Sequence, residues 1–268
     1  MRILAEACAP GDPGFCAPGV NAFYPPPLFE FTIAGIHFQV TRIMVLCWAV
    51  TAVILAVMVG AVRRPQLVPG RLQWFGESAY SFVRDGIARE VIGHEGLRFA
   101  PYLTTLFLFI LGNNLLGIVP LVQIAPTAKI AIPMFLAIIS WVLFNYVGIK
   151  RHGFAKYFKD IAFLPGVPKP MYLLVTPIEI FSTLIVRPFT LAVRLFANMF
   201  AGHLLLLVFT LGAAYLLTVG NFSLIFTPVS FGMSVVMTFF ELLVEVLQAY
   251  VFVILTSTYI AGALEEEH

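Results

Sequence analysis

Long runs of hydrophobic residues, separated by short polar stretches, dominate the pattern along this chain of 268 residues. Runs without charge cover residues 44–62, 102–123 and 130–149. Each run is long enough to cross about 30 Å of hydrocarbon, for which a helix needs about 20 residues. The pattern therefore predicts three membrane-spanning helices in the first part of the chain.

Two further hydrophobic stretches, at 171–217 and 223–263, are too long for simple spans. They would form helices of about 70 Å and about 60 Å, roughly twice the thickness of the hydrocarbon. We expect them to be strongly tilted or broken, with bends at Pro188 and Pro228, because proline removes a backbone hydrogen bond. The short turn TVGNFS between them predicts an antiparallel pair. The expected fold is an all-α membrane protein with about five membrane helices.

The stretch at 71–99 is too charged to cross a membrane, but it has the pattern of an amphipathic helix. We expect it to lie along the cytoplasmic surface of the membrane, although a helix packed on a partner protein would have the same pattern. Its apolar stripe consists of Leu72, Phe75, Ala79, Val83, Ile87 and Val91.

Basic residues at the ends of the first and third spans indicate the orientation of the chain. They are Arg63 and Arg64 after the first span, and Lys150, Arg151, Lys156 and Lys159 after the third. Loops rich in Lys and Arg stay in the cytoplasm, so the N-terminus is predicted outside and the C-terminus inside. We expect a multi-pass protein of the inner (plasma) membrane, with an N-terminal extracytoplasmic segment at 1–35 and a membrane domain at 36–268.

Composition supports a membrane protein and excludes several classes of function. Hydrophobic residues make up 60% of the chain and charged residues 11%, whereas soluble domains contain about 25% charged residues. The formal net charge of +2, without a basic block interleaved with aromatics, argues against nucleic-acid binding. The three cysteines form no Cys/His cluster, so no metal or cofactor is expected. Cys8 and Cys16 are free to form a disulfide loop if that end faces an oxidising compartment.

The few polar residues in the two long segments are the candidate functional residues. A charge at mid-bilayer costs about 2.5 to 3.5 kcal/mol on insertion scales, so such residues are rare without a function. Two of them, Glu179 and Arg187, are near the cytoplasmic end, where snorkelling to the interface explains them equally well. The others are Arg194, Asn198, His203, Glu241, Glu245 and Gln248.

Arg194 and Asn198 are four residues apart, about 40° round a helix, and so face one way. His203 lies about 180° from Arg194 and should face the second long helix, where Glu241 or Glu245 would favour proton exchange near neutral pH. Arginine stays protonated in proteins and cannot relay a proton itself. It can, however, hold a carboxylate ionised and block the direct passage of protons.

Glu241 lies about 40° from Glu245 and about 20° from Gln248, so these three residues form one polar stripe on the second segment. Such a stripe either outlines a path for protons or holds helices together through polar contacts. We favour the proton path, because burying two carboxyl groups only to hold helices together would cost much free energy. With Arg194 across it, the path behaves as an interrupted proton channel.

The motifs RLFANMFAGH at 194–203 and LQAYVFVILTSTYI at 247–260 resemble subunit a of the membrane sector of F-type ATP synthases. The resemblance covers the chain from about residue 36 to its end, and it is greatest to actinobacterial versions. It implies a non-catalytic, proton-translocating stator subunit with two aqueous half-channels, which load and unload the carboxylates of the rotating c-ring. The implied partners are the c-ring, the peripheral stalk subunit b, the remaining ATP synthase subunits and membrane lipid.

The resemblance also implies a role for each matching residue. Arg194 matches the arginine that faces the ring carboxylates and separates the half-channels, Gln248 matches the glutamine opposite it, and Asn198 matches an asparagine one turn along. His203 and Glu241 match two positions that hold one histidine and one carboxylate in either order.

One position departs from the family pattern. Some members carry an aspartate shortly after the asparagine of the second span; here Gly117 stands at the corresponding place in GNNLLGIVP, while Asn113 or Asn114 remains. We expect Glu245 to supply the missing carboxyl group of the outer half-channel. Protons would then enter near Asn114, His203, Glu241 and Glu245, and leave near Glu179.

A secondary ion-coupled transporter is the alternative function, since such proteins also use broken helices and buried charges. It predicts internal repeats and a midplane substrate cavity, and neither is visible in this sequence. The sequence contains no HExxH, which argues against a zinc-dependent intramembrane hydrolase. It also contains no GxxxxGK[ST], so any nucleotide chemistry is expected on partner subunits.

Overall fold

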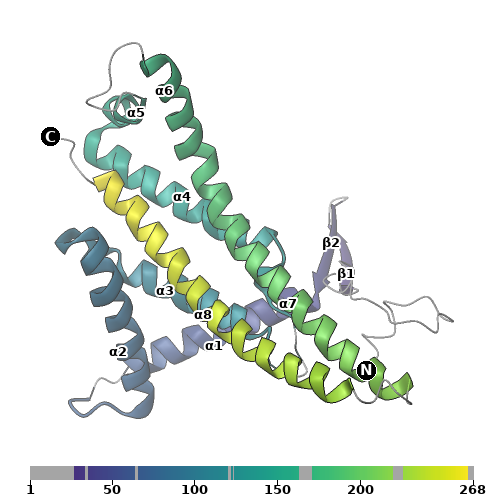
Figure 1. Ribbon diagram of the computed structural model, residues 1–268. Helices are drawn as coiled ribbons and strands as arrows, with labels where there is room; N and C mark the ends of the chain where they lie inside the picture. The colour runs from purple at the N-terminus through teal and green to yellow at the C-terminus, as the bar shows by residue number, and fades with distance from the viewer. Residues whose placement is uncertain are drawn as a thin grey trace. The chain divides into compact units, whose positions relative to one another are not determined.

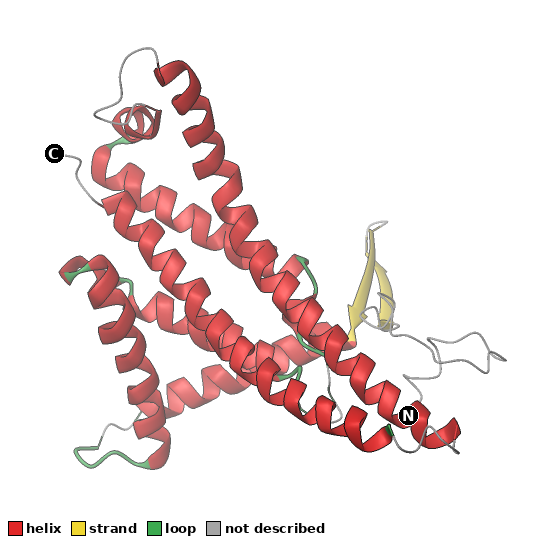
Figure 2. Cartoon of the chain, in the orientation of Figure 1, coloured by secondary structure: helices red, strands yellow, loops and turns green. Residues whose placement is uncertain are grey.

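The computed structural model describes residues 27–33, 36–63, 66–119, 122, 124–162, 171–219 and 226–264. Within these ranges helices dominate, and strands occur only in one hairpin (Figure 2). The predicted all-α membrane fold is confirmed. Cys8, Cys16, the turn between the long helices and the acidic C-terminal tail lie outside the described residues.

Four helices in the described part of the chain are long and apolar enough to cross a membrane (Figure 1). They are α1 (Arg42–Val62), α4 (Ala131–His152), the helical run Leu174–Leu217, and α8 (Thr227–Leu264). A fifth apolar helix, α3 (Ala100–Leu115), has 16 residues and a length of about 24 Å.

The helix α3 ends at Leu115, whereas the sequence predicts a span that continues to residue 123. The backbone amide of Gly117 donates to the carbonyl oxygen of Asn114 at 2.8 Å, so the chain leaves the helix through a tight turn. A short 3-10 helix, η5 (Pro126–Ala128), follows before α4. Hydropathy continues through this segment although the helix does not.

The first long segment changes its helix type near Pro188. It consists of α6 (Tyr172–Phe181), the π-helical section η7 (Ser182–Val186) and α7 (Arg187–Val219). Leu184 is a residue of the π-helical section. Its carbonyl oxygen cannot accept a hydrogen bond from Pro188, because proline has no backbone N–H group. A π-helical section thus lies next to Pro188, while the bend predicted at this residue stays a prediction. The bend predicted at Pro228 is wrong, because Pro228 is the second residue of α8 and prolines are tolerated in the first turn of a helix.

The amphipathic stretch forms α2 (Arg71–Val83), the π-helical section η3 (Arg84–Ile92) and the 3-10 helix η4 (His94–Arg98). Val83 and Ile87 of the predicted stripe are fully buried. Leu72 and Phe75 are instead 48% and 53% exposed, so only the middle of the stripe is fully packed against the protein.

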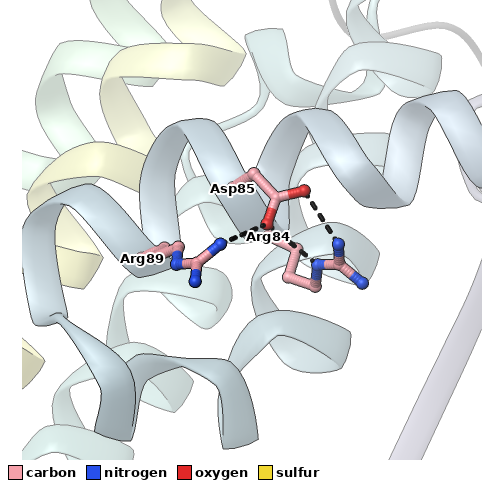
Figure 3. A network of polar contacts seen from close by, with 3 residues as sticks. All are labelled: Arg84, Asp85 and Arg89. Atoms are coloured by element: carbon pink, nitrogen blue, oxygen red, sulfur yellow. Dashed lines mark hydrogen bonds and ion pairs between the residues drawn. The ribbon is translucent and has the colours of Figure 1, made fainter.

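A small network of charges lies at the start of η3 (Figure 3). Arg84 donates to both carboxylate oxygens of Asp85, at 3.1 and 2.9 Å. Arg89, one turn along, lies 3.9 Å from the same carboxylate. The hydrogen bonds from Arg84 lower the pKa of Asp85, which therefore stays ionised on this polar face.

A two-stranded hairpin that the sequence analysis did not predict precedes α1. Its strands, β1 (Pro27–Ile33) and β2 (Ile36–Thr41), pair antiparallel, with Glu30 opposite Gln39. The side-chain amide of Gln39 donates to Glu30 Oε1 at 3.1 Å. The hairpin spans the boundary that the sequence analysis draws after residue 35.

The chain divides into two compact units, and several helices pass from one into the other. The first unit holds the described residues up to Val53, together with Leu111–Lys129 and Ala197–Leu247. The second holds Ile54–Ile110, Ile130–Phe196 and the described residues from Gln248 onward.

Within the second unit, α5 (Phe154–Ala162) packs on α4 through the buried side chain of Tyr157. The hydroxyl group of Tyr157 donates to Asn145 Oδ1 at 3.2 Å, and the amide of Asn145 donates to the carbonyl oxygen of Trp141 at 2.8 Å. Gly148 lies directly under the tyrosine ring, so that a Cβ atom at this position would overlap the ring. Burial raises the pKa of Tyr157.

Replacing Gly148 by alanine should weaken the packing of α5 on α4. The new methyl group forces the Tyr157 ring to move, and overpacking of this kind costs about 1 to 3 kcal/mol. We expect a lower melting temperature for purified complex that carries Gly148→Ala. The matched control is Gly262→Ala in α8, where a Cβ atom meets nothing within 4 Å. Equal melting temperatures for the two variants would contradict this account of the contact.

Candidate functional site

His203 in α7 and Glu241 in α8 form a buried pair within the first unit. His203 Nδ1 lies 3.9 Å from Glu241 Oε1, and the two side chains are 3% and 5% exposed. Gly202 lies beside the carboxyl group, and a Cβ atom there would make an ordinary van der Waals contact with Glu241 Oε1 at 3.5 Å. The prediction that His203 faces the second long helix is confirmed, and of the two candidate partners the structure selects Glu241.

A second polar contact joins the same two helices farther from this pair. The hydroxyl group of Ser230, near the start of α8, donates to the carbonyl oxygen of Phe209 in α7 at 3.1 Å. Residue numbers therefore rise in one helix as they fall in the other, from Phe209 with Ser230 to His203 with Glu241. The first unit thus contains the predicted antiparallel pair.

Glu245 is fully buried one turn after Glu241 and faces the end of α3. Asn114 donates through Nδ2 to the carbonyl oxygen of Glu245 at 3.3 Å and accepts through Oδ1 from the hydroxyl group of Thr127 at 2.6 Å. A Cβ atom at Gly117 would lie 3.0 Å from Glu245 Oε1. The carboxyl group of Glu245 therefore lies against Gly117.

The carboxyl groups of Glu241 and Glu245 have few hydrogen-bond donors. Among the described residues, no donor reaches either oxygen of Glu245 or Oε2 of Glu241. A polar group buried without a hydrogen bond costs free energy, and a charged one costs far more. Two such groups on one helix are hard to explain as an adhesive, and ionisable residues in this setting commonly handle protons.

Arg194 and Gln248 belong to the second unit. Arg194 in α7 is half-buried between the buried residues Leu191 and Leu195 of the same helix. Gln248 in α8 is 2% exposed. Asn198, four residues after Arg194, belongs to the first unit and is exposed.

Glu179 in α6 also belongs to the second unit, and it has a partner that the sequence analysis missed. Arg187 donates to Glu179 Oε1 at 3.2 Å, and the hydroxyl group of Thr183 lies 3.5 Å from the same oxygen. The spacing of eight residues gave no clear signal for this ion pair, because residues eight apart differ by about 80° around an unbroken α-helix. No signal in the sequence indicated the contact between Thr127 and Asn114, since it depends on how the loop after α3 returns.

Comparison with known proteins identifies the family. A family profile described as ATP synthase A chain matches residues 44–261, a segment that contains all the predicted site residues. The chain is 46% identical over 260 residues to ATP synthase subunit a of Parafrankia sp. (strain EAN1pec), which covers 94% of this chain and 85% of that one.

Two other relatives give the same result. ATP synthase subunit a of Frankia alni is 47% identical over 259 residues, with 94% of this chain and 87% of the relative covered. That of Rhodococcus erythropolis is 45% identical over 257 residues, with 95% and 92% covered. The alignments extend over nearly the full length of both chains, and the fold has the expected membrane helices. The chain therefore belongs to the ATP synthase A chain family.

Proposed function

We propose that this chain delivers protons to the carboxylates of a rotating c-ring and removes them again, through two half-channels that Arg194 keeps apart. As a member of the ATP synthase A chain family, it is a proton-translocating stator subunit of the membrane sector, and not a secondary ion-coupled transporter. The observation that carries the proposed route is the buried His203–Glu241 pair beside the buried carboxyl group of Glu245.

Protons enter the first half-channel near Asn114, His203, Glu241 and Glu245. An imidazole group and carboxyl groups exchange protons readily, and these groups lie within one unit. The asparagine amide contributes a hydrogen-bonding group at the end of α3. Glu245 takes the place of the aspartate that other members carry at the position of Gly117, because the two positions are in contact.

Transfer to the ring follows from the cost of burying charge. A protonated ring carboxyl group is neutral and can turn through the lipid, whereas an ionised one cannot leave the subunit interface at a reasonable cost. After nearly a full turn, the proton is released to the second half-channel near Glu179. Each proton supplies about 2.3 kcal/mol per 100 mV of membrane potential, so several are needed for one ATP.

Arg194 keeps the two half-channels separate because its guanidinium group remains charged. It favours the ionised form of a ring carboxylate that passes it, and it repels a proton that would cross directly. Asn198, one turn along from Arg194, and Gln248, which the family resemblance places opposite the arginine, provide neutral hydrogen-bonding groups. Proton flow is therefore possible only through rotation of the ring.

The chain performs no nucleotide chemistry in this proposal, and its partners are the c-ring, the peripheral stalk subunit b and the other subunits of the complex. The basic residues after α1 and α4 support a cytoplasmic position for those ends in the plasma membrane. The N-terminus is then outside and the C-terminus cytoplasmic.

Arg194→Ala should abolish proton pumping driven by ATP hydrolysis, because protons can then bypass the ring. The measurement is the quenching of a pH-sensitive dye in inverted membrane vesicles, normalised to the amount of assembled complex. Arg89→Ala, in the exposed network of η3, serves as the control and should pump at the wild-type rate. Pumping by Arg194→Ala at the wild-type rate would exclude the proposed barrier.

Exchanging the residues of the buried pair should restore function that either single change removes. We expect His203→Glu and Glu241→His each to slow pumping by about tenfold or more, and the double variant to recover most of it, since contacting residues are strongly coupled. Ser230→Ala removes another contact between the same helices and should have little effect. A double variant no better than the worse single one would show that the pair does not share a proton.

Glu245→Gln should slow ATP-driven pumping, because the amide cannot exchange a proton with its neighbours. Glu245→Ala should be similarly slow, and adding Gly117→Asp should restore part of the rate by returning a carboxyl group to the same space. Gly117→Asn in the Glu245→Ala background is the matched control and should restore nothing. If Glu245→Gln pumps like wild type, Glu245 is not part of the path.

A further inference from the structure

Arg187 lies at the centre of a second polar cluster, entirely within the second unit. Its Nη2 atom lies 3.2 Å from Glu179 Oε1, and its guanidinium carbon lies 5.5 Å from the centre of the Tyr259 ring in α8. The side chains of Arg187 and Glu179 are 35% and 31% exposed, so most of each is shielded. One guanidinium group thus joins a carboxylate of α6 to an aromatic ring of α8.

Neighbouring elements hold this cluster in place. The ring of Tyr259 packs on Phe144 of α4, with 5.6 Å between the ring centres. Tyr157 of α5 lies within electrostatic range of Arg187. Burial raises the pKa of Tyr157, and the positive charge of Arg187 opposes this rise. Tyr157 is in turn anchored by its hydrogen bond to Asn145.

The π-helical section explains how Glu179 and Arg187 meet. In an ideal α-helix, residues eight apart differ by about 80° around the axis. A π-helical turn contains one extra residue. Eight residues that include such a turn therefore rotate about as far as seven residues of an α-helix, and the angle between Glu179 and Arg187 falls to about 20°. The section Ser182–Val186 therefore brings the two side chains to the same face.

Snorkelling alone does not account for this arrangement. A snorkelling arginine extends its head group to water and needs neither a carboxylate nor an aromatic ring. Here the guanidinium group makes a charge-assisted hydrogen bond and lies over a ring, a combination that suits the planar fork of arginine. Arg187 and Thr183 both contact Oε1 of Glu179, which leaves Oε2 for exchange of a proton.

We propose that Arg187 is a positioning residue for proton release: it fixes the carboxyl group of Glu179, through Oε1, in the orientation that accepts a proton from the second half-channel. This inference rests on the proposed function, in which protons leave near Glu179. Arg187 itself carries no proton, because its guanidinium group does not release one. Its effect on transport should therefore depend on the presence of the Glu179 carboxyl group.

The test is a double-mutant cycle in the complete ATP synthase, assayed as ATP-driven pumping in inverted vesicles and normalised to assembled complex. We expect Arg187→Gln to slow pumping by about tenfold, a coupling typical of contacting charged residues, and Arg187→Lys to retain most of the rate. In a Glu179→Gln background, Arg187→Gln should add less than about twofold. Arg98→Gln, which removes an exposed ion pair with Glu95 in the same unit, is the control and should pump normally.

Several results would overturn the inference. A merely structural Arg187 predicts that Arg187→Gln slows pumping equally with and without the Glu179 carboxyl group, and that Arg187→Lys is no better. Wild-type pumping by Arg187→Gln, or by Glu179→Gln alone, would also exclude it. Slow pumping by Glu179→Gln together with wild-type pumping by Arg187→Gln would overturn this inference alone. Wild-type pumping by Glu179→Gln would also exclude the proposed exit, and failure of the barrier would appear as unchanged pumping in Arg194→Ala.

Discussion

The cost of placing a charge in hydrocarbon is the constraint on which this structure depends. Most of the chain avoids this cost, since its membrane helices are almost entirely apolar. In the described part of the chain, buried polar side chains of α7, α8 and the end of α3 occur together: His203 lies beside Glu241, and Asn114 donates to the backbone carbonyl oxygen of Glu245. Ionisable groups are expensive singly in this setting, and in the proposed route His203 and Glu241 share a proton.

The same constraint gives the ionisable side chains two different roles. Glutamate and histidine side chains change their charge by gaining or losing a proton, so they can form a path. Arginine side chains keep their charge, so they can only direct what happens around them. In the proposed mechanism the chain uses both kinds: the carboxyl groups of Glu241, Glu245 and Glu179 exchange protons, while Arg194 and Arg187 act as fixed charges.

The spans and the two long helices could be predicted from the sequence because hydropathy reports directly on burial in lipid. The direction of His203 was also predictable, since it follows from helical periodicity. Three features were not predictable for identifiable reasons. The helix α3 stops while the hydrophobic run continues, the π-helical section changes the phase between Glu179 and Arg187, and the position of Pro228 at the start of α8 removes its effect. The sequence also could not show that Glu241, and not Glu245, is the partner of His203. The partner depends on how far α7 and α8 are shifted along each other, whereas periodicity gives only the direction of a side chain around its helix.

The shortness of α3 has a consequence for water. A helix of about 24 Å cannot cover about 30 Å of hydrocarbon, so irregular backbone after Leu115 has to lie below the membrane surface. Such backbone is tolerated only where protein covers it or where it borders a hydrated cavity. Residues Pro126, Thr127 and Ala128 are buried in protein, whereas Val119 and Ile130, on either side of them in the chain, are exposed. In the proposed route, the described part of this loop brings hydrogen-bonding groups such as Thr127 to the place where Asn114 and Glu245 meet, and so shortens the distance over which other side chains must conduct a proton.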